Sequence, residues 1–255
     1  MTASVFDSPM YAKAFPVGEA GRLFTHSAEI RAALLVLGTV AKIQGETGVI
    51  PEDSAFFIHR SAMEVQIDPA GLATGVAQDN SYVPALVTAF AKAMEAPEHS
   101  GYILHHTRPQ DIADTALMLR LRQLLTQAET ALSALPQNEA TRVALAALPA
   151  LRRTAIHVAF DDTPEIGTAL AETLKLGAPQ AITASVHAIS AWLAQTAEAL
   201  CPAAKTPQAA MLCATVTAHH TLLTQAEDPG AARLLCLPHI ALGTLSLLHQ
   251  AASNA

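Results

Sequence analysis

Arg153, Thr154 and His157 bring together three side-chain types that acid–base chemistry uses. A guanidinium binds carboxylates, a hydroxyl donates hydrogen bonds to them, and an imidazole exchanges a proton near neutral pH. The three residues come at the end of an apolar helical pattern, where they could face a polar cavity. The alternative is structural, because basic side chains in the last turn of a helix interact favourably with its dipole. The sequence leaves both interpretations open.

Two pairs of adjacent histidines, His105–His106 and His219–His220, raise the question of a metal site. Adjacent side chains on a helix or strand point apart, so neither pair is expected to chelate an ion alone. The chain has no H-E-x-x-H motif and offers no cysteine partner beside either pair. We therefore expect no metal and no other cofactor.

The three cysteines are widely spaced, odd in number, and form no C-x-x-C pair. They are Cys201, Cys213 and Cys236. Such a pattern argues against a disulfide framework. We predict that they are buried, small hydrophobic side chains in a reducing cytoplasm.

The composition argues against several classes of protein. Of the 255 residues, 51% are hydrophobic and 15% are charged, whereas a disordered chain combines low hydrophobicity with high net charge. Charge, Pro or His interrupts the apolar runs before the ~20 residues of a membrane span, and the first residues lack the pattern of a signal peptide. The net charge is −7 and there is no basic cluster, which gives nucleic-acid binding little support. We expect a cytoplasmic protein with neither a membrane nor a nucleic acid as partner.

The apolar residues recur with helical spacing, and the alternation typical of strands is nearly absent. The clearest helix runs from about Gln110 to Leu135, a length that suits a bundle. A helix over 27–46 has Ser27 as its candidate N-cap, with Gly45 and Gly48 near its end. Further helices are expected over 51–62, 69–77, 84–95, 138–153, 163–176, 182–200, 207–227 and 231–253.

These elements predict an all-α fold that forms an elongated helical bundle. We expect an N-terminal helical region over 1–109 and a bundle over 110–255, joined as one continuous structural unit. Pro149 and Pro238 should kink or break their helices. Trp192 is expected to anchor the core between helices.

Several stretches together resemble one enzyme family. They are SPMYAKAFPVGEAGRLF (8–24), AEIRAALLVLGTVAKIQGETGVIPEDSA, IHRSAMEVQIDPAGLA, VPALVTAFAKAMEAPEHSGYI and QDIADTALMLRLRQLL. Through them the first 150 residues resemble 3-carboxy-cis,cis-muconate cycloisomerase, of the fumarase/aspartase/adenylosuccinate lyase superfamily. Similarity resumes at TPEIGTALAETLKLG (163–177) and EDPGAARLLCLPHIALG (227–243). The resemblance implies the superfamily's helical bundle. It also implies a lactonisation in aromatic (protocatechuate) degradation, in which a carboxylate oxygen attacks a diene.

The family's first site motif, G-A-T-S-Q-D-I, enters the long helix and binds a substrate carboxylate through its Thr and Ser. The corresponding residues here are 106–112, of which Gln110, Asp111 and Ile112 match. Arg108 and Pro109 stand at the Thr and Ser positions, so two hydroxyl donors and one backbone donor are lost. By the resemblance, Gln110 and Arg108 are candidate substrate-binding residues, since Arg108 could still bind a carboxylate with different geometry.

The second motif, R-T-x-x-Q-x-A-x-P, corresponds to residues 153–159. Arg153, Thr154 and His157 are the candidate catalytic residues, with His157 at the Gln position. After Ala159 the expected start of a further long helix is missing. The acidic pair that follows, Asp161–Asp162, is interpreted most simply as the flank of the helix beginning near Thr163.

The third motif, G-S-S-x-M-P-x-K-x-N-P, carries on a mobile loop the serine seen as the catalytic base. Its nearest counterpart is residues 201–207, in which Pro202 and Pro207 keep their spacing. The serines are gone, and Ala204 and Thr206 stand at the Lys and Asn positions. Lys205, one place away, is a third candidate substrate-binding residue.

The departures from the family pattern fall on chemistry, whereas the helical scaffold is largely kept. Two hypotheses follow. The chain is either a shortened cycloisomerase with impaired or lost activity, or a non-catalytic paralogue. The paralogue would act as an oligomer partner or as a small-carboxylate-binding protein. A missing long helix would leave the bundle incomplete, with an exposed apolar stripe on 110–135 and 182–200. We therefore expect a homo-oligomer or association with a full-length paralogue, and a small polycarboxylate as the candidate ligand.

Overall fold

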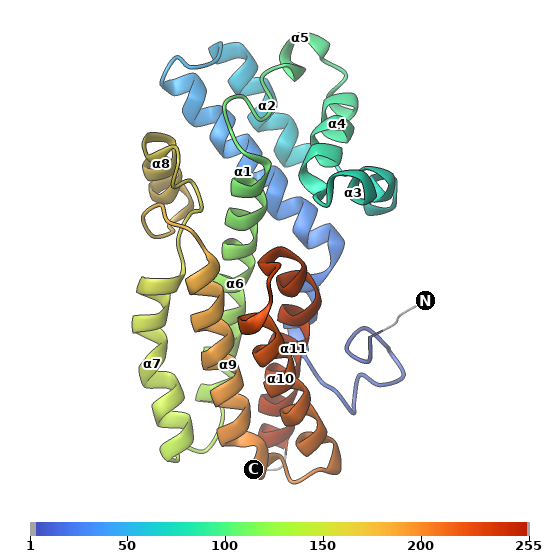
Figure 1. Cartoon of the computed structure of the whole chain (residues 1–255), viewed down its shortest axis with the longest axis vertical. Coiled ribbons are helices and arrows are strands. Elements are labelled where there is room, and N and C mark those ends of the chain that lie inside the picture. Colours follow the sequence, from blue (N-terminus) through green and yellow to red (C-terminus); the bar gives the residue numbers. More distant parts are fainter. Residues whose placement is uncertain (1–3, 254–255) are drawn as a thin grey trace. The chain divides into compact units, whose positions relative to one another are not determined.

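The computed structural model describes residues 4–253, which fold into helices joined by short turns (Figure 1). The all-α prediction is confirmed. Within the described residues the only strand-like pairing is an isolated bridge between His157 and Gly177. The helices are α1 (His26–Glu46), α2 (Glu52–Glu64), α3 (Ala73–Asp79), α4 (Tyr82–Met94), α5 (Pro97–Ser100), α6 (Pro109–Ser133), α7 (Glu139–Ala155), α8 (Pro164–Leu174), α9 (Thr183–Ala204), α10 (Pro207–Gln225) and α11 (Pro229–Ser253), with short 3-10 helices η1 (Gly18–Phe24) and η2 (Pro69–Leu72).

The chain divides into two compact units that interleave along the sequence. The α1–α2 unit comprises residues 25–121 and 156–182, and the bundle unit comprises residues 4–24, 122–155 and 183–253. Helix α6 belongs to the α1–α2 unit up to Leu121 and to the bundle unit from Arg122.

The α1–α2 unit is organised around the close packing of its first two long helices, which lie side by side (Figure 1). A Cβ at Gly38 would come within 2.7 Å of the Ala62 Cβ, and one at Gly45 within 2.3 Å of the Ala55 Cβ. Two glycines on one helix therefore face two alanines on the other, and this lets the helix backbones approach. The core of the unit includes the fully buried Phe90.

The bundle unit is built on α9, which packs against α7, α10 and α11. The prediction that Trp192 anchors the core is confirmed, because its side chain is buried and its Nε1 donates to the Ala144 carbonyl of α7 at 3.1 Å. On the other side, the buried Thr244 hydroxyl of α11 donates to the Leu193 carbonyl of α9 at 3.2 Å. These bonds tie α7 and α11 to α9.

Most predicted helix boundaries agree with the structure to within a few residues, but some details differ. Helix α1 is capped by Thr25, whose hydroxyl accepts from the Ala28 N–H, and not by Ser27, which lies inside the first turn. Gly45 lies within α1, whereas Gly48 follows its end at a φ of +72°. Helices α7 and α11 continue through Pro149 and Pro238 without a break.

The apolar stripe expected to be exposed on α6 and α9 is absent from the described residues, because large hydrophobic side chains of both helices are buried. Helix α9 is covered by α7, α10 and α11 of the same chain. In the bundle unit, the exposed large apolar side chains include Met10 before η1, Val143 on α7, and Leu222, Leu234 and Leu235 on α10 and α11, the last three each at least 60% exposed.

Helix α11 is long and apolar enough to cross a membrane, judged by length and composition alone. However, 67% of its most apolar window is buried inside the protein, as expected for the central helix of a packed bundle. Of the cysteines, Cys236 is buried as predicted, while Cys201 and Cys213 are half-buried, and all three are free thiols.

Candidate functional site

Arg108 lies just before α6, in the α1–α2 unit, and is held by three carboxylates of the same chain. Its Nε and Nη2 donate to Asp111 at 2.7–3.1 Å. Its Nη2 also donates to Asp161 at 2.7 Å, and its Nη1 donates to Asp162. The guanidinium that we predicted for a substrate carboxylate therefore already carries internal anions. Because these carboxylates outnumber the one cation, the cluster is negatively charged overall.

Asp111 is the buried member of this cluster, since its side chain is 5% exposed whereas that of Arg108 is 47% exposed. Burial raises the pKa of Asp111 above its usual value, although the hydrogen bonds from Arg108 oppose the rise. The hydrogen bond to Asp111 in turn raises the pKa of Arg108 above its usual value. The carboxylate also lies in the first turn of α6, where the helix dipole favours a negative charge.

The rest of the 106–112 stretch makes local contacts. The Gln110 side-chain amide donates to Asp114 one turn along α6 at 2.7 Å, and the Thr107 hydroxyl donates to the His105 carbonyl at 3.0 Å. The His105 and His106 rings contact each other, with centroids 4.1 Å apart. The pair lies in a turn, where His106 has a φ of +50°, so the rule that adjacent side chains on a helix or strand point apart does not apply to it.

His157 lies in a buried extended segment of the α1–α2 unit and is only 2% exposed. Its Nδ1 donates to the Val158 carbonyl at 3.1 Å. The pKa of His157 is lowered by burial, which the bond to Val158 partly opposes, so the neutral imidazole is favoured. A buried neutral ring of this kind resembles a packing element more than an exposed proton donor.

Hydrogen bonds on two sides fix the segment that contains His157. The Ala159 N–H donates to the buried Thr115 hydroxyl of α6 at 3.0 Å. On the other side, the Val158 N–H donates to the Gly177 carbonyl at 3.2 Å, and the Gly177 N–H donates to the Ile156 carbonyl at 2.9 Å. A Cβ at Gly177 would lie 2.9 Å from that Ile156 oxygen. Only glycine fits at this position without displacing the Ile156 carbonyl.

Replacing Gly177 by Val is expected to lower the free energy of unfolding by about 1–3 kcal/mol, the usual effect of overpacking a close contact. Urea unfolding followed by circular dichroism measures the change. Gly101→Val is the matched control in the same unit, because nothing lies within 4 Å of a Cβ at Gly101. Equal losses in the two variants would contradict the role assigned to Gly177.

The remaining candidates, Arg153, Thr154 and Lys205, belong to the bundle unit. Arg153 and Thr154 are exposed in the last turn of α7, where the Thr154 hydroxyl donates to the Ala150 carbonyl at 3.1 Å. Lys205 follows α9 with a φ of +49° and lines a small cavity of about 180 Å³ with Asn138 and Thr141. Within the bundle unit, the candidates are therefore separated into a helix end and a turn. Within the α1–α2 unit, Arg108 belongs to the charged cluster.

Residues 201–207 span the end of α9, a two-residue turn and the start of α10 in the bundle unit. Helix α9 continues through Pro202 to Ala204, and α10 begins at Pro207. The Thr206 hydroxyl accepts from the Ala209 N–H at 3.1 Å and donates to the Gln250 Oε1 at 2.8 Å. Thr206 is therefore a helix cap tied to α11, at the position where the resemblance expects an Asn that binds carboxylate.

Sequence reasoning missed the pairing of Asp161 and Asp162 with Arg108. The i, i+3 spacing of Arg108 and Asp111 is a usable local signal, but nothing in the sequence links Arg108 to residues 53 and 54 positions away. For a metal the structure offers no support within residues 4–253, where no group of three or more His, Cys, Asp or Glu side chains is placed to hold an ion.

Comparisons with known proteins place this geometry in context. No protein-family model matches the chain. One curated relative, N-acetyl-S-(2-succino)cysteine lyase of Enterococcus italicus, is 30% identical over 123 residues, which are 48% of this chain and 26% of the relative. The chain therefore spans about a quarter of that relative's length.

Solved structures give a more extensive match. Beta-carboxy-cis,cis-muconate cycloisomerase of Acinetobacter calcoaceticus matches with a TM-score of 0.82 and 18% identity, over 95% of this chain and 76% of that one. The 3-carboxy-cis,cis-muconate lactonizing enzyme of Pseudomonas putida matches with a TM-score of 0.82 and 18% identity, over 95% of this chain and 75% of that one. A fumarate lyase of Mesorhizobium matches with a TM-score of 0.77 and 16% identity, over 92% of this chain and 74% of that one. The chain therefore has the all-α fold of the fumarase/aspartase superfamily, and its structure is similar to those of 3-carboxy-cis,cis-muconate cycloisomerases.

Proposed function

We propose that this chain is a shortened member of the 3-carboxy-cis,cis-muconate cycloisomerase family whose catalytic activity is impaired or lost. The observation that carries the proposal is the Arg108 cluster, in which Asp111, Asp161 and Asp162 occupy the guanidinium. Two solved cycloisomerase structures with the same fold and a curated lyase relative support the family.

The chemistry explains why this cluster matters. Lactonisation develops charge on a carboxylate beside the reacting carbon, and fixed donors must stabilise that charge. By the resemblance, a Thr and a Ser supply such donors where this chain has Arg108 and Pro109. Pro109 has no donor, and Arg108 directs its N–H groups to internal carboxylates. A polycarboxylate approaching this point would meet a net negative charge instead of a cationic site.

The turn at 201–207 supports the same proposal. The resemblance expects there a mobile loop with the serine base, whereas this chain passes from α9 into α10 through two residues, Lys205 and Thr206. Neither the loop nor its serines are present in the sequence. A general base must reach the proton that it removes, and the capped turn provides no serine for that role.

The proposal is tested by incubating purified protein with 3-carboxy-cis,cis-muconate and following the loss of diene absorbance. A full-length cycloisomerase serves as the positive control. Conversion by this chain at the rate of the full-length enzyme would show that the site has been rebuilt and not lost.

We further propose that the protein works in the cytoplasm as an oligomer, either with itself or with a full-length paralogue. The supporting observation is the exposed apolar surface of Leu222 on α10 and Leu234 and Leu235 on α11. Leu234 and Leu235 are adjacent in the chain, and contiguous exposed apolar surface is typical of interaction sites.

Light scattering at tens of micromolar, a concentration that suits a modest affinity, is expected to give a mass above the 26.7 kDa of one chain. Leu234→Gln together with Leu235→Gln should lower the mass, because both changes remove apolar surface. Val143→Gln, at an exposed position on α7, is the control. A wild-type protein that is strictly monomeric, alone and when mixed with the full-length paralogue, would refute the oligomer.

A further inference from the structure

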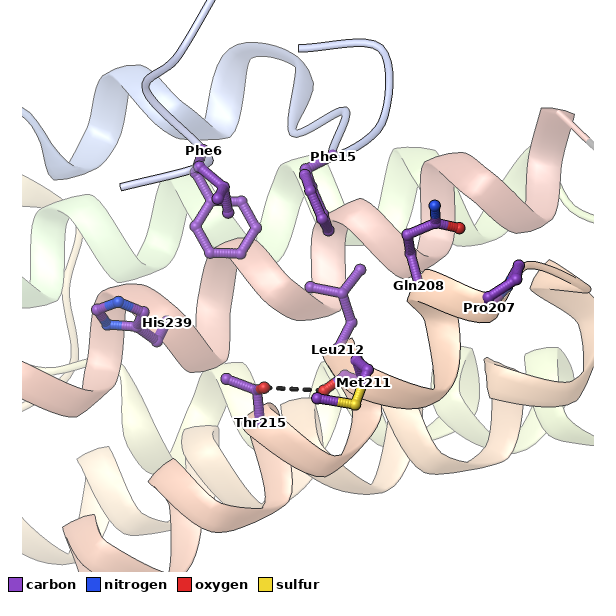
Figure 2. Close-up of a pocket in the computed structure, with 9 residues that line it drawn as sticks. Phe6, Phe15, Pro207, Gln208, Met211, Leu212, Thr215 and His239 are labelled. Atoms are coloured by element: carbon purple, nitrogen blue, oxygen red, sulfur yellow. Dashed lines mark hydrogen bonds between the residues drawn. The ribbon is translucent and has the colours of Figure 1, made fainter. Parts of the chain in front are cut away.

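A groove in the bundle unit lies between the segment before η1 and helices α10 and α11 (Figure 2). Its volume is about 450 Å³. Phe6 and Phe15 line one side, Met211, Leu212 and Thr215 of α10 another, and His239 comes from α11. In Figure 2, Phe6 and Phe15 lie on one side of this space, Leu212 lies opposite them, and His239 lies at one end. The volume is within the range of 300–1,000 Å³ that is usual for sites of small organic ligands.

Aromatic rings form a continuous row along this groove. The Phe6 ring meets the Phe15 ring edge to face, with centroids 6.3 Å apart, and meets the His239 ring at 6.4 Å. His239 in turn stacks on His219 of α10, with centroids 4.7 Å apart and planes inclined by 8°. Aromatic edges and faces presented in this way favour another ring in offset or edge-to-face contact.

The polar side chains of the groove are those of Gln208, Thr215 and His239, and the last two already make hydrogen bonds within the chain. The Thr215 hydroxyl donates to the Met211 carbonyl at 2.8 Å. The His239 Nδ1 lies 3.0 Å from the Leu235 carbonyl, so Nδ1 carries the proton and donates it. In the neutral imidazole the opposite nitrogen, Nε2, is then a hydrogen-bond acceptor.

We infer that this groove binds a small, uncharged, ring-containing molecule that donates one hydrogen bond to His239. The side chains that line the groove include no Asp, Glu, Lys or Arg within the described part of the chain. A charged ligand would lose hydration here without gaining a partner, which is costly. An uncharged ring would instead bury apolar surface against Phe6, Phe15 and Met211 and satisfy the His239 acceptor.

A second copy of the chain fits this groove less well. Phe6 and Phe15 of the same chain line one side of the groove, and its volume of about 450 Å³ suits a small molecule better than a folded protein surface. The apolar side chains that suit a flat protein surface, Leu222, Leu234 and Leu235, do not line it.

The experiment compares two fluorescent probes that differ by one charge. N-phenyl-1-naphthylamine is uncharged, has two ring systems and carries one N–H donor, and 8-anilinonaphthalene-1-sulfonate is the same molecule with a sulfonate. Titration of wild-type protein with the uncharged probe should give a saturable rise in fluorescence. The sulfonate should bind at least about tenfold more weakly, because it brings an unpaired charge into the groove.

Three variants locate the bound probe. Met211→Gln should weaken binding about tenfold, by removing apolar contact from a side chain that is 70% exposed and therefore not needed for folding. His239→Phe keeps a ring in the row but removes the acceptor, and should weaken binding roughly two- to tenfold. Val143→Gln on α7, an exposed apolar position outside the groove, should bind like wild type.

Several outcomes would overturn the inference. They are the absence of saturable binding up to about 100 μM probe, equal or tighter binding of the sulfonate, and equal binding by Met211→Gln and wild type. A fourth is an oligomer that Met211→Gln dissociates while neither probe binds, since the groove would then be a subunit interface. The probe titrations do not measure turnover, so their outcome is independent of the test of the proposed function.

Discussion

Purified protein is expected to convert 3-carboxy-cis,cis-muconate at least about 10²–10³-fold more slowly than a full-length cycloisomerase assayed beside it. The loss of a single donor to the developing oxyanion has an effect of that size. Here the site has lost the donor that Pro109 replaces, Arg108 is occupied by carboxylates, and the serine loop is absent. Effects of residues that act as a unit do not add, so the three losses cannot be multiplied together. The range for one lost donor is therefore the smallest reduction in rate that we expect.

The variants Arg153→Ala and His157→Ala show whether any residual rate comes from this site. We expect both to leave the residual rate unchanged, because Arg153 is exposed on the end of α7 and His157 is buried, with a pKa lowered by that burial. Correct folding of each variant is checked by circular dichroism. Turnover like that of the full-length enzyme, abolished by either change, would refute the proposal and identify a rebuilt site.

Replacing Arg108 by Ala is expected to lower the free energy of unfolding by about 1–3 kcal/mol at pH 7. The change leaves the buried Asp111 carboxylate without the guanidinium that now donates to both of its oxygens, and an unsatisfied buried acceptor carries a penalty of this order. Urea unfolding measures the difference. Arg60→Ala is the control in the same unit, because its pairing with Glu64 is exposed and should contribute less than about 1 kcal/mol.

The effect of Arg108→Ala should also depend on pH. Because the pKa of Asp111 is raised on folding, the folded protein holds more protons than the unfolded chain above the usual Asp pKa of about 3.9. The contribution of this group to stability is therefore present below that value and is lost as pH rises through the raised pKa. Without Arg108 the pKa rises further, so the variant should approach wild-type stability as pH falls toward about 4. A difference from wild type that is the same at all pH values would contradict this account.

The helices could be predicted from the sequence because each has a long apolar pattern and a local start or stop signal. The helix expected from Gln110 to Leu135 runs over Pro109–Ser133, and the expected start at Pro207 is where α10 begins. Neither Pro149 nor Pro238 breaks its helix, because packing in a bundle can compensate for the hydrogen bond that a proline inside a helix removes.

The candidate site was harder to predict because its contacts join residues distant in sequence. The motif comparison placed Arg108 at a carboxylate-binding position, but Asp161 and Asp162 reach it from beyond α7. His157 follows a helix in the sequence, yet the structure places it in an extended segment paired with Gly177, which no periodicity indicated. The roles of Arg153, Thr154, His157, Gln110 and Lys205 in binding or turnover stay predictions until they are assayed.

The interleaving of the two units has a consequence for how the protein is made. The α1–α2 unit takes its residues from 25–121 and again from 156–182, and its core includes the buried Val158, Phe160 and Leu170 of the later stretch. During synthesis, at roughly 5–20 residues per second, the first stretch leaves the ribosome seconds before the second. Over that interval the helices of the first stretch would expose to solvent the core that Val158, Phe160 and Leu170 later complete. Nascent chains halted between Leu121 and Ile182 should therefore be strong clients of chaperones, and release of the later segment should end that dependence.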